Sequence, residues 1–206
     1  DIVINVDLKP SNELQTIEIV ADESERIEDR TRMSTINIPI EQIKKVPALL
    51  GAVDVLKVLQ LLPGVKSGGE GTSGLYVRGG GPDQNLILLD GTPIYNASHL
   101  FGFFSTFNAD AIKNVELTKG GFPARYGGRL SSVIDINMKE GNQRKYNVEG
   151  SIGLITSKIL VEGPIWKDKT SFIFTARRTY IDKLTQPIAK AISRGTGSFG
   201  YYFYDL

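Results

Sequence analysis

The sequence lacks cysteine altogether and contains a single histidine, His99, among its 206 residues. These residues can therefore form no disulfide, no thiolate metal site, no cysteine nucleophile and no site that needs two histidines. Charge of one sign is not in excess either, because 24 Lys and Arg are balanced by 23 Asp and Glu. The chain lacks the basic surplus typical of nucleic-acid-binding proteins, so we expect no nucleic-acid partner.

Long apolar runs are missing as well. No stretch approaches the roughly 18 apolar residues of a membrane-spanning helix, and the first residues, Asp1-Ile2-Val3, carry no signal-peptide pattern. A membrane-spanning β-strand needs only about 9 to 11 residues of alternating character. The absence of a long apolar run therefore leaves strands of a membrane β-barrel open.

Motifs that carry catalysis or nucleotide binding are also absent. Gly69, Gly71 and Gly74 match the dinucleotide fingerprint in spacing, but they follow a predicted helix and precede a predicted strand, the reverse of what phosphate binding needs. Neither a GK[ST] sequence nor a GxSxG motif occurs, and a lone histidine such as His99 is typical of a loop or structural position. We therefore predict no catalytic residue, no metal ligand and no cofactor.

The first forty residues predict two short strands and a charged linker. Residues 2–8 alternate between apolar and polar and stop at Pro10, which predicts a strand. A second β-prone run, Thr16-Ile17-Glu18-Ile19-Val20, precedes residues 22–32, where charges dominate and too little apolar surface is present to repay ordering. The second run is either an edge strand, which its pattern alone favours, or an extended motif that adds itself to another protein's sheet.

The central part of the chain predicts a small mixed α/β domain. A helix over residues 52–62 is predicted by apolar residues at helical spacing that stop at Pro63-Gly64. Short β-prone runs separated by glycine-rich loops follow at residues 75–78, 86–89, 113–118 and 133–138.

Six segments of this central part resemble, in their order along the chain, the plug domain of TonB-dependent outer-membrane receptors. They are Leu61-Leu62-Pro63-Gly64-Val65, Val77-Arg78-Gly79, Leu86-Ile87-Leu88-Leu89-Asp90-Gly91, Ile112-Lys113-Asn114-Val115-Glu116-Leu117-Thr118-Lys119-Gly120, Ala124-Arg125-Tyr126-Gly127-Gly128 and Val133-Ile134-Asp135-Ile136. The resemblance implies an α+β plug domain, a small mixed sheet with short helices, followed by the first strands of a 22-stranded antiparallel transmembrane β-barrel.

The resemblance also divides the chain. Residues 1–9 are similar to the end of a preceding β-sandwich-like domain of the carboxypeptidase-regulatory type, and residues 10–40 to a linker that carries the TonB box. Residues 41–141 correspond to the plug and residues 142–206 to the start of the barrel. Because fewer than seventy residues follow the plug, we expect the chain to be part of a longer protein.

For the start of the barrel we expect two strands and the beginning of a third. The run from Tyr146 to Val161 predicts the first strand, residues 172–180 the second and Tyr201 the opening of the third, with a turn at Trp166-Lys167-Asp168-Lys169. Apolar and polar residues alternate well in the second strand. They alternate poorly in the first, where Lys158 and Glu162 share a face with Leu160.

The function implied by the resemblance is TonB-dependent import of a nutrient across the bacterial outer membrane, without enzymatic activity. Thr16, Ile17, Glu18, Ile19 and Val20 resemble the TonB box, which pairs with the protein TonB in the periplasm while the plug lies in the barrel lumen. The other implied partners are the remainder of the barrel, outer-membrane lipid and an extracellular ligand, which is a siderophore, glycan, peptide or vitamin.

Two groups of plug residues are expected to make contacts. The loops at residues 66–73 and 92–103 are expected to face outward, with Glu70, Tyr95, Asn96 and His99 toward the ligand, and Arg78 and Arg129 are expected to contact the barrel. Two other functions stay open. One is a carbohydrate-binding module that uses the aromatic loop at residues 99–104, and the other is an outer-membrane signalling receptor.

Overall fold

The computed structural model describes residues 34–46, 53–69, 73–99, 102–183, 186–187 and 200–206. The predicted strand at residues 2–8, the box at residues 16–20 and Glu70 lie outside these residues. The elements are β1 (Thr35–Pro39), α1 (Ile40–Lys44), α2 (Val55–Leu59), β2 (Val65–Ser67), β3 (Leu75–Val77), η1 (Pro82–Gln84), β4 (Asn85–Leu89), β5 (Thr92–Pro93), β6 (Ser98–His99), β7 (Phe104–Ser105), η3 (Ala109–Ala111), β8 (Ile112–Lys119), β9 (Ser132–Met138), β10 (Asn147–Ile152), β11 (Thr156–Trp166), β12 (Thr170–Thr179) and β13 (Tyr204–Asp205).

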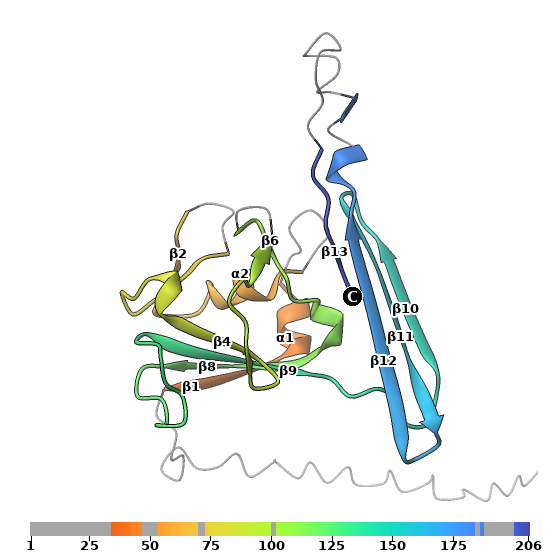
Figure 1. Cartoon of the computed structure of the whole chain (residues 1–206), viewed down its shortest axis with the longest axis horizontal. Helices are drawn as coiled ribbons and strands as arrows, with labels where there is room; N and C mark the ends of the chain where they lie inside the picture. Colours follow the sequence, from red (N-terminus) through yellow and green to blue (C-terminus); the bar gives the residue numbers. More distant parts are fainter. Residues whose placement is uncertain (1–33, 47–52, 70–72, 100–101, 184–185, 188–199) are drawn as a thin grey trace, which may run out of the picture. The chain divides into compact units, whose positions relative to one another are not determined.

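Five strands form a mixed sheet, the central sheet, in the order β1-β8-β9-β4-β5 (Figure 1). Its one parallel pair is β4 with β9, and the other neighbours are antiparallel. β4, β8 and β9 begin and end within one residue of the predicted runs. The hairpins β2-β3 and β6-β7 complete this part of the chain.

β1 is a strand of the central sheet that sequence analysis placed in the linker. Ile36 and Ile38 alternate with Asn37, Ile38 is buried, and the strand pairs along its whole length with β8. The five residues of β1, which follow a charged segment and end at Pro39, carry little periodicity of their own. Pairing with a long neighbour therefore decides their structure.

The predicted helix over residues 52–62 is shorter in the structure. α2 begins after Asp54, whose Oδ1 accepts a hydrogen bond from the Lys57 backbone N–H at 3.2 Å, as a helix N-cap does. After Leu59 the chain continues in tighter turns, and Gly64 then adopts a φ of +78°, a conformation that favours glycine.

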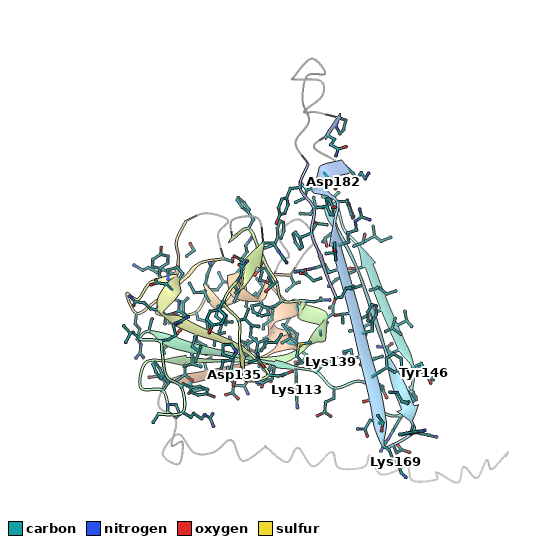
Figure 2. The ribbon with its side chains drawn as sticks, in the orientation of Figure 1. Lys113, Asp135, Lys139, Tyr146, Lys169 and Asp182 are labelled. Carbon is teal, nitrogen blue, oxygen red and sulfur yellow. The ribbon has the colours of Figure 1, made fainter. Side chains whose placement is uncertain are left out.

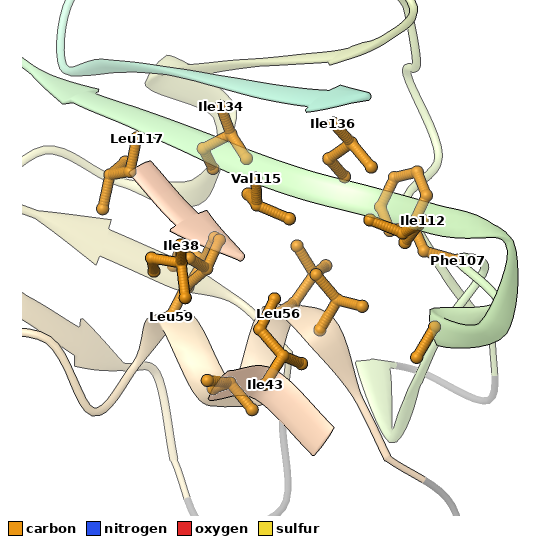
Figure 3. Close-up of a cluster of buried hydrophobic side chains, with 14 of the residues drawn as sticks. Ile38, Ile43, Leu56, Leu59, Phe107, Ile112, Val115, Leu117, Ile134 and Ile136 are labelled. Carbon is orange, nitrogen blue, oxygen red and sulfur yellow. The ribbon is translucent and has the colours of Figure 1, made fainter. Parts of the chain in front are cut away.

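The core lies between α1, α2 and one face of the central sheet. Figure 3 shows Ile43, Leu56 and Leu59 of the helices facing Val115 and Ile136 of β8 and β9. All five side chains are at most 2% exposed. Burial of this apolar surface is the main stabilising contribution to a domain with such short helices.

Four antiparallel strands form a second sheet, the C-terminal sheet, in the order β10-β11-β12-β13. The single strand predicted from Tyr146 to Val161 is wrong, because the chain reverses at residues 153–155 and β10 pairs back onto β11. The Gly153 N–H donates to the Thr156 carbonyl at 2.8 Å in this turn. Leu154 and Ile155 are apolar, so the turn interrupts no apolar pattern that the sequence displays.

The predicted turn at residues 166–169 is confirmed. It joins β11 to β12, with the Lys169 N–H donating to the Trp166 carbonyl at 3.0 Å. Figure 2 shows Tyr146 and Lys169 toward this end of the C-terminal sheet and Asp182 at its other end. None of the helices in the described part of the chain has the length and apolar character needed to span a membrane.

The two faces of β11 and β12 differ in exposure. Leu160, Glu162 and Arg177 are at most 6% exposed, whereas Ile159 and Phe174 on the opposite face are 44% and 49% exposed. We call the buried side the inner face. It carries both apolar and charged residues, which accounts for the poor alternation of β11 in the sequence.

Candidate functional site

The predicted ligand-facing residues occupy different environments. Tyr95 is 88% exposed, and Asn96 accepts a hydrogen bond from the Ser98 N–H through Oδ1 at 3.4 Å. His99 in β6 is half-buried instead. Its Nε2 lies 2.6 Å from Asp205 Oδ1, and its ring stacks on Phe203 at 4.0 Å between centroids. The structure thus brings His99 onto the C-terminal sheet and leaves Tyr95 exposed.

The predicted barrel contacts Arg78 and Arg129 make local hydrogen bonds in the described chain. Arg78 Nη2 donates to Ser34 Oγ at 3.2 Å, and its backbone has a φ of +48°. Arg129 Nη1 donates to the carbonyl of Gly128 at 2.9 Å. A contact of either residue with further barrel strands stays a prediction.

Asp110 in η3 lies between two lysines, one from helix α1 and one from the C-terminal sheet. Its Oδ1 is 2.9 Å from Nζ of Lys44 in α1, and its Oδ2 is 2.5 Å from Nζ of Lys158 in β11. Burial raises the pKa of Asp110, but the hydrogen bonds and charges of Lys158 and Lys44 outweigh it and hold the pKa below its ordinary value. Asp110 is therefore a carboxylate at neutral pH and joins the helix to the strand.

The C-terminal sheet packs against the segment that leads from β7 to η3. Arg177 in β12 is the most buried cation there, at 6% exposed. Its Nε and Nη2 donate to Asp205 Oδ2 at 2.9 and 2.6 Å. Arg177 also binds two main-chain carbonyls of the segment that leads from β7 to η3. Nη2 donates to the Ser105 carbonyl at 2.7 Å and Nη1 to the Phe107 carbonyl at 3.4 Å. The planar guanidinium suits this arrangement, because one group satisfies several oxygens in fixed directions.

An apolar cluster lies beside these polar contacts. Phe104 of β7 packs with Ile155 and Phe203, all at most 8% exposed. The Arg177 guanidinium also lies 5.3 Å from the centroid of the Phe203 ring, a cation–π contact. Phe203 therefore has His99, Phe104 and Arg177 around it.

Ser105, whose carbonyl accepts a hydrogen bond from Arg177, is also linked to helix α2 in the core. Its N–H donates to Asp54 Oδ2 at 2.6 Å, and this hydrogen bond is buried. Asp54 therefore serves two donors, the Lys57 N–H at the start of α2 and the Ser105 N–H of β7. A further ion pair, Lys139 with Glu162 at 3.4 Å, lies where the chain passes from β9 toward the C-terminal sheet.

Sequence reasoning missed most of these residues. Arg177 belongs to the polar residues of the second predicted strand and Lys158 to the mixed face of the first, and the sequence assigned a partner to neither. Asp110 and Asp205 lie in no motif. The one available signal was the presence of Lys158 and Glu162 on the same face as Leu160, which is expected where a strand covers a packed domain rather than water or lipid.

Comparison with known proteins decides the family. The model of the TonB-dependent Receptor Plug Domain family matches residues 28–133, just over half of the chain. The chain belongs to the TonB-dependent receptor plug family. The matched range contains β1 and all of the central sheet up to the start of β9, so β1 is part of the plug.

Two curated receptors illustrate the relationship. The ferrienterobactin receptor of Escherichia coli K12 is 32% identical over 123 residues, which are 51% of this chain and 16% of that receptor. The probable TonB-dependent siderophore receptor PirA of Acinetobacter baumannii is 27% identical over 190 residues, 77% of this chain and 24% of that receptor. The chain spans about a quarter of these receptors at most.

The crystal structure of the siderophore receptor PirA from Pseudomonas aeruginosa has the same fold over the aligned part, with a TM-score of 0.53 at 22% identity, covering 73% of this chain and 29% of that one. The fold expected from the sequence is confirmed: the central sheet with its helices is the plug, and the C-terminal sheet is the first part of the barrel.

Proposed function

We propose that the protein to which this chain belongs imports a nutrient across the bacterial outer membrane, driven by TonB, with this chain supplying the TonB box and the gating plug. The observation that carries the proposal is the plug-family match over residues 28–133, followed in the chain by strands whose inner face packs on that plug. The two curated relatives named above are receptors, and this supports a function in uptake rather than catalysis.

For the ligand we propose an iron–siderophore complex. The names of the relatives support this class, since they include a ferrienterobactin receptor and a siderophore receptor. In the plug, the exposure of Tyr95 supports its role as a ligand-facing residue, and Asn96 and Glu70 are proposed beside it. His99 contributes less directly, because its ring already stacks on Phe203.

The division of the chain follows from the same proposal. Residues 16–20 form the box on a linker in the periplasm, and the plug lies in the lumen of the barrel. The plug begins at β1 or before it and ends near residue 141, and residues 1–9 close a preceding domain. Arg78 and Arg129 face the remaining barrel strands, where acidic partners would suit them.

The aromatic loop gives little support to a carbohydrate-binding function. Sugar rings stack on exposed aromatic faces, whereas Phe104 is 5% exposed and His99 stacks on Phe203. Of the rings of this loop that the structure describes, that of Phe103 is exposed, at 45%, and one exposed ring makes a weak platform. The signalling alternative depends on residues 1–9, which lie outside the described part of the chain.

The experiment that tests the proposal measures binding of the TonB C-terminal domain to a peptide of residues 14–22. We expect binding, because a β-prone segment adds to an exposed sheet edge through main-chain hydrogen bonds. The matched control has Ile17, Ile19 and Val20 replaced by proline, which removes three N–H donors and breaks the strand. Absence of binding at high micromolar peptide, or equal binding of the proline control, would contradict the box.

A further inference from the structure

We propose that residues 104–111 of the plug, the anchor segment, are fixed to the barrel by Lys158 and by Arg177, which Asp205 binds in turn, and that this anchor stays closed while other parts of the plug rearrange during import. The claim that the anchor stays closed during import rests on the proposed function. The claim that the anchor segment is fixed to the barrel rests on the contacts of Lys158 and Arg177 alone.

The first argument is the placement of two cations. Lys158 of β11 and Arg177 of β12 are directly opposite each other in the strand register, on the inner face. Like charges in such a pair repel each other. The plug supplies the oxygens that compensate this repulsion, the Asp110 carboxylate for Lys158 and two backbone carbonyls for Arg177. Removing the anchor segment would take away the Asp110 carboxylate and both carbonyls, and would leave Arg177 with the Asp205 carboxylate.

The second argument is the kind of acceptor that Arg177 uses on the plug. The carbonyls of Ser105 and Phe107 belong to the main chain, so the contact fixes the path of the backbone and not a single side chain. The guanidinium is 6% exposed. A buried cation that loses its acceptors is far more costly than an exposed one, and this holds the segment in place.

The third argument is that the anchor segment belongs to the core of the plug. Phe107 and Ala109 are buried in the main apolar cluster, and η3 runs directly into β8, the central sheet's longest strand. On the other side, Ser105 is tied to Asp54 and thus to α2. The barrel therefore holds a rigid part of the plug and not a loop tip.

Other plug elements are attached less firmly in the described chain. The edge strand β5 and Lys66 and Ser67 of β2 are exposed. His99 contacts Asp205 at the margin of the anchor, where both side chains are about one-fifth exposed. These elements can move while the Arg177 and Lys158 contacts remain.

Hydrogen–deuterium exchange of the full-length receptor in detergent tests the anchor without ligand or TonB. In Arg177→Ala we expect the amides of residues 104–111 to exchange at least tenfold faster, with the exchange of β11 unchanged. Arg177→Lys keeps the charge but lacks the several fixed donors of the guanidinium, so we expect a smaller increase. The matched control is Arg178→Ala, because Arg178 is the exposed neighbour on the other face. Equal protection in Arg177→Ala and Arg178→Ala would overturn the anchor.

A cleavable cross-link tests whether the anchor stays closed. The 206 residues contain no cysteine, so Asp110→Cys and Lys158→Cys can be joined by a short bis-methanethiosulfonate reagent, with each single variant as control. In cells whose unmodified receptor imports ferric enterobactin, we expect cross-linked receptor to import at the rate of reduced receptor. Import lost on cross-linking and restored by a reductant would overturn the proposal, as would failure to cross-link. An unmodified receptor that imports nothing would contradict the proposed function. It would also contradict the claim that the anchor stays closed during import, but the exchange experiment would still decide whether the anchor exists.

Discussion

Asp54 offers a sharp test of how the plug core is held together, because one carboxylate serves two separate backbone donors. Replacing it by alanine removes the N-cap of α2, which costs about 0.5–2 kcal/mol. It also leaves the Ser105 N–H, in a residue with no exposed surface, without its acceptor, and an unsatisfied buried donor costs about 1–3 kcal/mol. We therefore expect Asp54→Ala to destabilise the plug by about 2–4 kcal/mol.

The assay is protease resistance of the plug in the full-length receptor across a urea series. With an m-value of about 1–3 kcal/mol per molar urea, the expected loss lowers the midpoint by about 0.7–4 M. In Asp54→Asn the side-chain oxygen can still accept from one of the two N–H donors, but the side-chain NH2 group faces the other donor. We therefore expect an intermediate midpoint. Asp83→Ala, at an exposed acidic position of η1, is the matched control and should stay within about 0.5 kcal/mol of wild type. Equal midpoints for Asp54→Ala and the control would refute the reasoning.

Two further predictions use the same urea assay. Asn85 is 6% exposed, donates to the carbonyls of Leu75 and Gly81 and accepts from the Ser132 hydroxyl, so Asn85→Ala should cost about 2–4 kcal/mol; a loss below about 1 kcal/mol would contradict this. The lowered pKa of Asp110 means that its contribution is complete above the ordinary carboxyl pKa, about 4, and is lost as the pH falls through the lowered value. The stability difference between wild type and Asp110→Asn should therefore stay constant above about pH 5 and shrink as the pH falls below about 4, and a difference that does not vary with pH would count against the ion pairs.

Sequence periodicity predicted the strands that have a long apolar pattern and a turn signal beside it. β8 and β9 are long and apolar on one face, and the segment between them contains the glycines at positions 120, 121, 127 and 128. β1 is only five residues long and is defined by its pairing with β8. The turn at residues 153–155 carries apolar side chains, so the alternation gives no sign that the chain reverses there.

The contact between plug and barrel was harder to foresee for a different reason. An inner barrel face that covers water should be polar, and one that covers a packed domain can be both polar and apolar. Leu160 and Glu162 lie on that face, and both are nearly completely buried. The irregular alternation of β11 is therefore what a strand that covers a packed domain shows. Which plug residues it covers depends on contacts between positions as far apart as His99 and Asp205, and no local pattern encodes those.

Ser105 explains why such a contact leaves no mark on the sequence. Its N–H is bound by Asp54 and its carbonyl by Arg177, so a single residue links helix α2 of the plug to strand β12 of the barrel. Both links use main-chain atoms, which every residue except proline provides. The Ser105 side chain contributes little to either link, since its buried Oγ has no hydrogen-bond partner in the described chain. These two hydrogen bonds therefore do not specify which small residue stands at position 105, and the specificity of the contact lies in Asp54 and Arg177, 123 positions apart in the sequence.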